Sequence, residues 1–152
     1  MILTQILEPE CIKVPLAAGD KVSVITELVD ILGANKLLTD RDDVLQAVLG
    51  RENTRSTGIG SGIAIPHGKC NGVKDLVMSI GISRQGVDFQ SIDGKPVHIV
   101  VLLVSPMDRT GPHIQALARI SRLMLDEEFK NKLQNAVSAQ ELYELINSKE
   151  TE

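Results

Sequence analysis

The sequence predicts an α/β fold in which helices flank a mixed central β-sheet on both faces. Apolar residues recur at helical spacing near both ends of the chain, and short apolar runs rich in Val and Ile occupy its middle. A chain of 152 residues fits one hydrophobic core, and no repeat, low-complexity tract or linker divides it. We therefore expect a single domain over residues 1–152.

Two helices are expected in the first third of the chain. The first follows Asp20, a capping residue placed before an apolar stripe, and Gly33 is placed to end it. The second begins at the capping-box pattern of residues 39–42 and is expected to stop around Gly50. That boundary leaves Arg51 just beyond the second helix.

Three apolar segments are the expected strands: 62–66, 76–82 and 97–104. The last reads VHIVVLLV, a β-branched run typical of a strand that is covered on both faces. Asp93-Gly94 is a turn signal between the second and third segments, which indicates that these two pair in antiparallel fashion.

The last third of the chain is expected to be helical. Pro112 occupies a position favoured for a first helical residue, which places His113 near a helix N-terminus. A further helix carries Phe129, and Ser138 with a glutamate three residues later opens the last one.

Composition excludes several classes of function. Aromatic residues make up 2% of the chain, too few for a platform that stacks bases or sugars, and the net charge of -4 gives no basic stripe for nucleic acid. Cys11 and Cys70 form no CxxC pair, so we expect reduced thiols. No export signal or run of roughly 20 apolar residues is present, so no membrane insertion and a cytoplasmic location are expected.

The segment that is richest in chemistry is RENTRSTGIGSGIAIPHGK, residues 51–69. Its glycines let backbone approach a bound group, and Ser56, Thr57 and nearby N–H groups are neutral donors for an anion. The spacing matches neither the GxGxxG nor the GxxxxGK[ST] nucleotide motif. Pro66 and Gly68 flank His67 and present its imidazole, a competent neutral nucleophile that needs no metal or cofactor.

The stretch STGIGSGIAIPHGK resembles the active-site signature of enzyme IIA proteins of the fructose/mannitol class (type 2) in the phosphoenolpyruvate-dependent phosphotransferase system. The likeness covers nearly the whole chain, from ILEPECI through DGKPVHIVVLLVSP to the final ELYELI segment, and is greatest to the nitrogen-regulatory branch. The resemblance implies that His67 accepts a phosphoryl group, at Nε2, from a histidine phosphocarrier protein. The phosphorylated form then passes the group to a IIB domain or regulates partner proteins.

The resemblance also implies a second histidine and an arginine in the site. His113 corresponds to that histidine, and a position near a helix N-terminus suits an anion. Arg51 corresponds to the arginine, whose fork of donors suits phosphoryl oxygens. With Ser56 and Thr57 as phosphate-binding candidates, these residues supply the positioning and charge compensation that phosphoryl transfer needs.

Other readings of the same residues remain open. One is a purely regulatory binding module that never passes a phosphoryl group on. Another is a metal site, although its candidate ligands lack the spacings that favour zinc: His67, Cys70, His98 and His113. His98 begins an apolar strand and is interpreted as structural. Ser61 lacks the GxSxG elbow of hydrolases.

Overall fold

The computed structural model describes residues 2–152 and contains a six-stranded sheet flanked by five α-helices. The strand order is β1-β5-β6-β3-β2, and β4 also pairs with β6. The strands are β1 (Ile12–Lys13), β2 (Gly58–Gly60), β3 (Ile63–Ala64), β4 (His67–Lys69), β5 (Val77–Val87) and β6 (Val97–Ser105).

The sheet is mixed, as the sequence predicts. Strands β5 and β6 pair antiparallel along most of their length, whereas β1 runs parallel to β5, and β3 and β4 run parallel to β6. Side chains of β6 alternate between two separate apolar clusters, with Val101 in one and Leu102 in the other. This central strand is therefore buried on both faces, which explains its continuous apolar sequence.

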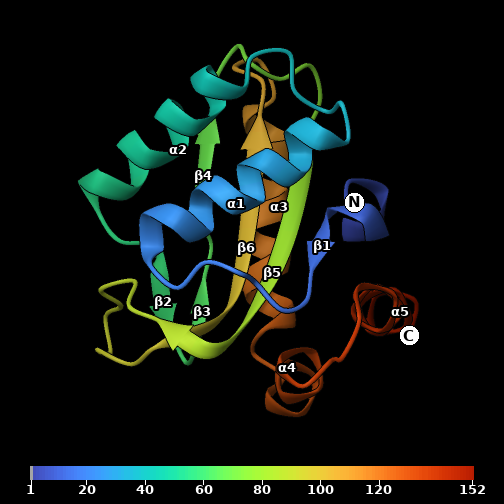
Figure 1. Cartoon of the computed structure of the whole chain (residues 1–152). Coiled ribbons are helices and arrows are strands. Elements are labelled where there is room, and N and C mark those ends of the chain that lie inside the picture. Colours follow the sequence, from blue (N-terminus) through green and yellow to red (C-terminus); the bar gives the residue numbers. More distant parts are fainter. Residues whose placement is uncertain (1) are drawn as a thin grey trace.

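Helices cover both faces of this sheet. Figure 1 shows α1 (Lys21–Ala34) and α2 (Arg41–Thr54) in front of it and α3 (Thr110–Leu123) behind it. The chain closes with α4 (Glu127–Gln134) and α5 (Ala139–Glu150), and the 3₁₀ turns η1 (Leu3–Gln5) and η2 (Pro9–Cys11) open it. The predicted α/β class, with helices on both faces, is confirmed.

The expected end of the second helix is wrong. Helix α2 is capped by Asp40, whose carboxylate accepts from the Asp43 N–H at 3.1 Å, and it continues through Gly50 to Thr54. A glycine inside a helix costs only about 1 kcal/mol, and the buried Glu52 after it makes contacts that hold the last turn in place. Arg51 consequently lies in the helix and not beyond it.

The glycine-rich strand is shorter than expected. Only Ile63 and Ala64 of segment 62–66 form β3, which pairs with β2 in a hairpin. Gly60 and Gly62 have φ values of 96° and 82° in the tight turn between the two strands, a left-handed conformation that glycine adopts without strain. His67 begins β4, a separate strand beside β6.

The remaining boundaries differ from the predictions by a few residues. Strand β5 extends past residue 82 to Val87, and α3 begins at Thr110, so that Pro112 is its third residue. The Ser138 cap of α5 is confirmed, because its hydroxyl accepts from the Glu141 N–H at 3.1 Å.

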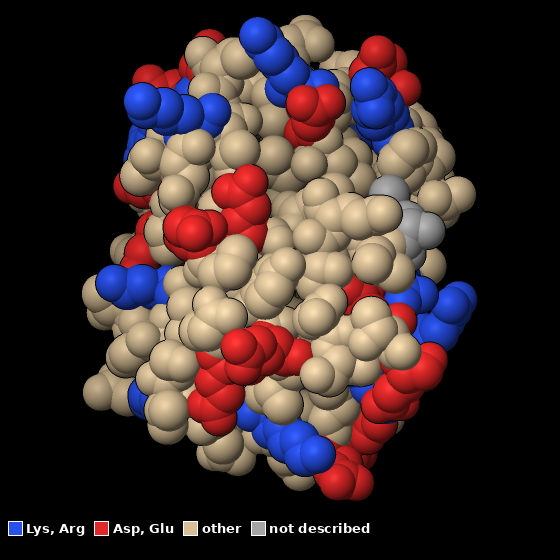
Figure 2. All heavy atoms as spheres, turned by 90° about the vertical axis from the view of Figure 1, so that its right-hand side faces the viewer, with Lys and Arg blue, Asp and Glu red and all other residues tan. Residues whose placement is uncertain are grey.

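The surface shows charges of both signs. On the face in Figure 2, Lys and Arg side chains are interspersed with Asp and Glu around a largely uncharged centre, and they form no continuous basic band. Within residues 2–152, none of the helices combines the length and apolar character that crossing a bilayer requires.

Candidate functional site

His67 lies where β4 passes beneath α2. It pairs with Leu103 of β6, and the following Gly68 packs directly against the α2 backbone. A Cβ atom at position 68 would lie 3.2 Å from the Val48 nitrogen and 3.3 Å from the Ala47 carbonyl carbon, so a side chain there would push the strand away from the helix. Gly68 thus determines how closely β4, and with it the His67 imidazole, lies to α2.

The His67 ring is held by its own backbone. Its Nδ1 lies 2.8 Å from the carbonyl oxygen of Ile65, two residues earlier, and the ring is half-buried. Burial lowers the pKa of His67 below 6.5; the Arg51 charge also lowers it, whereas the bond to Ile65 and the Glu52 charge act in the opposite direction. The ring is therefore neutral at neutral pH.

His113 stands beside His67, as expected from the resemblance. The two ring centroids are 5.5 Å apart with an interplanar angle of 58°. His113 projects from the first turns of α3, is 6% exposed, and its Nδ1 contacts the Ser105 hydroxyl at the end of β6. Burial, then the neighbouring His67 and Lys69, lower its pKa to about 4. Both imidazoles are thus neutral and adjacent.

Arg51 lines the surface next to the two histidines. It lines two depressions that also share His67, one of about 410 Å³ that His113 borders and one of about 300 Å³ beside the glycine-rich loop. Its Nη1 donates to the Arg55 carbonyl at 2.8 Å, which turns the guanidinium toward the end of α2. The guanidinium cation of Arg51 therefore borders both of the depressions from which the His67 ring can be reached.

Ser56 and Thr57 line the smaller depression, but their hydroxyl groups already have protein partners. The Ser56 hydroxyl donates to the Phe89 carbonyl and accepts from the Gly58 N–H at 3.0 Å. The N–H and hydroxyl of Thr57 both donate to the carboxylate of Glu52. A direct phosphate-binding role for Ser56 and Thr57 stays a prediction.

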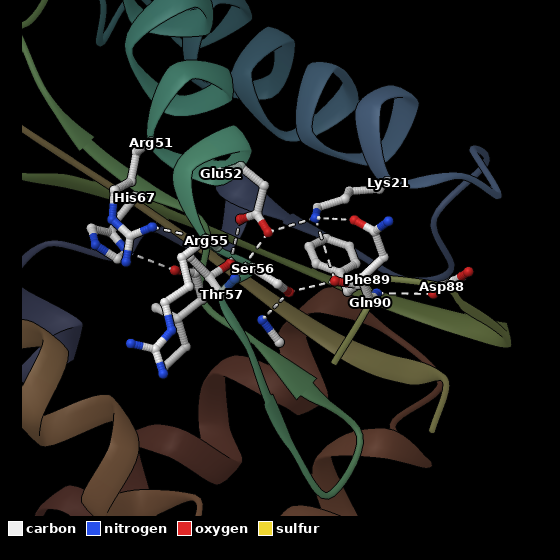
Figure 3. A network of polar contacts seen from close by, with 12 residues as sticks. Lys21, Arg51, Glu52, Arg55, Ser56, Thr57, His67, Asp88, Phe89 and Gln90 are labelled. Carbon is white, nitrogen blue, oxygen red and sulfur yellow. Dashed lines mark hydrogen bonds and ion pairs between the residues drawn. The ribbon is translucent and has the colours of Figure 1, made fainter. Parts of the chain in front are cut away.

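Sequence reasoning missed the polar network behind this loop, which Figure 3 shows. The Glu52 side chain is 3% exposed, and one of its oxygens lies 2.8 Å from Nζ of Lys21 on α1. Lys21 also donates to the Phe89 carbonyl at 3.3 Å. The network links α1, the last turn of α2 and the two loops that contain Thr57 and Phe89. Only the position of Glu52 inside the motif hinted at this role.

His98 lies outside the site. Its Nδ1 is 2.9 Å from the Ser83 carbonyl oxygen, and it sits five residues before the β6 partner of His67. At about 3.3 Å per residue, this spacing corresponds to roughly 16 Å along the strand. Within residues 2–152, no group of three or more His, Cys, Asp or Glu side chains is arranged to hold a metal ion.

Comparison with known proteins identifies the family. Residues 5–149 match the family model described as "Phosphoenolpyruvate-dependent sugar phosphotransferase system, EIIA 2". The chain is 37% identical over 147 residues to the PTS system fructose-specific EIIABC component of Bacillus subtilis, covering 97% of this chain and 23% of that longer protein. It is 33% identical to the nitrogen regulatory protein of Bradyrhizobium diazoefficiens, covering 96% of this chain and 95% of the relative.

Solved structures agree with this relationship. The nitrogen regulatory protein IIA-Ntr of Neisseria meningitidis has 29% identity and a TM-score of 0.87, over 95% of this chain and 98% of that one. The IIA mannitol structure of Escherichia coli, at 24% identity and a TM-score of 0.78, covers 91% of this chain and 97% of its own and shares the fold. The chain therefore belongs to the type-2 enzyme IIA family of the phosphoenolpyruvate-dependent phosphotransferase system.

Proposed function

We propose that His67 carries a phosphoryl group on Nε2 as a covalent phosphohistidine. The donor is a histidine phosphocarrier protein. In a transport role, the acceptor is a IIB domain. In a regulatory role, partner proteins recognise the phosphorylated state of this protein. In the loading step the Nε2 lone pair forms a P–N bond while the P–N bond of the donor breaks, and the donor imidazole recovers the electron pair.

The contact that carries this proposal is the one between Nδ1 of His67 and the Ile65 carbonyl, at 2.8 Å. A carbonyl oxygen only accepts hydrogen bonds, so Nδ1 carries the hydrogen, and the lone pair of the neutral ring is on Nε2. The lowered pKa keeps this tautomer unprotonated at neutral pH. The nucleophile is thus prepared without an activating base.

The surroundings of the ring suit the charge that develops during transfer. Arg51 borders both depressions next to His67, and a guanidinium compensates phosphoryl oxygens well. His113 is neutral and adjacent, so it places a polar N–H beside the ring without adding a second positive charge. Phosphoryl transfer depends largely on such positioning and charge stabilisation.

Exposed apolar side chains give a protein partner a place to dock. Ile59 and Ile92 are 47% and 77% exposed and line the depression beside the glycine-rich loop. Met107, 55% exposed, lines the depression between the two histidines. Exposed apolar side chains that gather at one place on a surface mark sites of protein contact. Here they form a rim around the polar site. We propose this rim as the surface that meets the donor and the acceptor in turn.

The test is phosphorylation in a reconstituted relay. The protein is incubated with phosphoenolpyruvate, the general phosphotransferase enzyme and the histidine phosphocarrier, and an acid-labile phosphoryl adduct is measured by mass spectrometry. His67→Ala should remain unlabelled, and His113→Ala should label slowly. His98→Gln, which alters an imidazole at the far part of β6, is the matched control and should label like the unmodified protein. Full labelling of His67→Ala would overturn the proposal.

Transfer of the phosphoryl group to a IIB domain distinguishes a transport role from a regulatory role. The labelled protein is mixed with a IIB domain of the fructose or mannitol class, and the phosphoryl group is followed. Transfer indicates a role in sugar uptake. Its absence, together with partner binding that depends on the labelled state, indicates a regulatory module.

A further inference from the structure

The side chain of Ser105, the last residue of β6, lies against the imidazole of His113. Ser105 is 0% exposed, and its hydroxyl has one hydrogen-bond partner among residues 2–152, Nδ1 of His113. The Ser105 backbone carbonyl is taken separately, by the Cys70 N–H at 3.0 Å. Among residues 2–152, the Ser105 hydroxyl therefore forms its hydrogen bond with His113 alone.

The direction of this hydrogen bond follows from counting donors. A hydroxyl carries one hydrogen, and a buried hydroxyl whose hydrogen has no acceptor is disfavoured, by roughly tenfold or more. If Nδ1 donated to Ser105, the hydroxyl hydrogen would lack any acceptor within the described residues. If the hydroxyl donates to Nδ1, both groups are satisfied. The hydrogen of the neutral imidazole is then on Nε2.

We infer that Ser105 is a positioning residue that holds His113 as the Nε2–H tautomer, so that His113 donates a hydrogen bond to the phosphoryl group carried by His67. The inference rests on the proposed function for its last step. Nε2 lies on the ring edge away from Ser105, and His113 borders the same depression as His67 and Arg51. The neighbouring imidazoles are thereby set in opposite tautomers, one with a bare Nε2 that attacks and the other with an Nε2–H that donates.

The contrast with the other two histidines gives an internal control. His67 and His98 each place Nδ1 next to a backbone carbonyl, of Ile65 and Ser83 respectively, so both should carry Nδ1–H. Long-range ¹H–¹⁵N spectra of the imidazole rings, recorded well above pH 6.5, report the tautomer of each histidine directly. Two rings should show the Nδ1–H pattern, and His113 alone should show Nε2–H. An Nδ1–H pattern for His113 in the unmodified protein would overturn the inference.

Variants of Ser105 test its part in this arrangement. In Ser105→Ala, His113 should become a mixture of tautomers, and labelling of His67 at saturating donor should slow by roughly threefold to tenfold, the weight of one hydrogen bond. The half-saturating donor concentration should not change, because the docking rim is intact. Ser105→Thr keeps the hydroxyl and should restore both the spectrum and the rate.

Ser79→Ala is the matched control for loss of a buried hydroxyl. Ser79 is also 0% exposed, but it lies on β5 and donates to the Leu28 carbonyl, so its loss should leave the His113 spectrum unchanged. An unchanged His113 tautomer in Ser105→Ala would overturn the inference. Failure of the unmodified protein to accept any phosphoryl group would instead overturn the proposed function, while the spectrum would still decide the role of Ser105.

Discussion

Replacing Glu52 with alanine should destabilise the protein strongly, although Glu52 is not expected to touch a phosphoryl group. The carboxylate is 3% exposed, lies 2.8 Å from Nζ of Lys21 and accepts the N–H of Thr57 at 2.9 Å as well as its hydroxyl. The variant leaves a largely buried ammonium without its carboxylate and two donors of Thr57 without their acceptor. Removing one member of such a pair costs about 3–5 kcal/mol of the free energy of unfolding.

This loss is large compared with the total stability of a domain, about 5–15 kcal/mol. For a chain of this length, each kcal/mol lowers the melting temperature by about 2–4 °C, so Glu52→Ala should melt about 6–20 °C below the unmodified protein. Circular dichroism melts and urea titrations measure the two quantities. Glu52→Gln, which keeps an acceptor for Thr57 but not the charge, should lose roughly half as much.

Two controls decide whether the buried network is the cause. Glu128→Ala removes an exposed carboxylate, 3.6 Å from Lys132, and should leave the melting temperature nearly unchanged because surface pairs contribute little. The double variant Lys21→Ala with Glu52→Ala should be less destabilised than the sum of the two single variants. A melting temperature of Glu52→Ala within about 2 °C of the unmodified protein would refute this account of the network.

Three further predictions concern the His67 imidazole, the glycine that follows it and the cap of the last helix. The rate of phosphoryl acceptance, followed by mass across a pH series, should fall as His67 becomes protonated, with its midpoint below pH 6.5; a midpoint above 6.5 would contradict the lowered pKa. Gly68→Ala should lose about 1–3 kcal/mol in urea titrations, since its Cβ would lie 3.2 Å from the Val48 nitrogen; wild-type stability would argue against this tight packing. Ser138→Ala should lose about 1 kcal/mol by the same measurement, because the α5 cap is removed.

The pH dependence of stability should also report on His113. Its pKa is about 4 in the folded protein and about 6.5 when unfolded, so between these values the unfolded chain binds more protons. Stability from this residue is therefore present above pH 6.5 and is lost as pH falls toward 4, on the order of 3 kcal/mol in total. A His113→Gln variant, titrated with urea at several pH values, should show a flatter profile.

Local signals in the sequence predicted the helices and the central strands, and long-range contacts explain where the predictions failed. Gly50 is a reasonable stop for a helix by propensity, but Glu52 reaches Lys21 and Thr57 and holds one more turn. The expected five-residue strand before His67 is reduced to two paired residues, because its partners β2 and β6 fix where pairing ends, and no local pattern reveals that.

The candidate site divides in the same way. His67 is predicted from the long glycine-rich motif that ends in the Pro-His-Gly turn. The approach of His113 depends on the end of β6 meeting the start of α3, and only the resemblance indicated it. Ser105 and Lys21 carry no motif. Their roles arise from contacts with His113 and Glu52, which no local sequence pattern reveals.

The bond between Nδ1 of His67 and the Ile65 carbonyl determines how the proposed phosphorylated form would differ from the unmodified one. It is encoded within three consecutive residues and leaves Nε2 uninvolved, so the same bond serves whether that nitrogen is bare or substituted. Loading should then leave the backbone where it was. A protein that distinguishes the two forms would have to sense the added negative charge and bulk at one point of the surface, and not a rearranged fold.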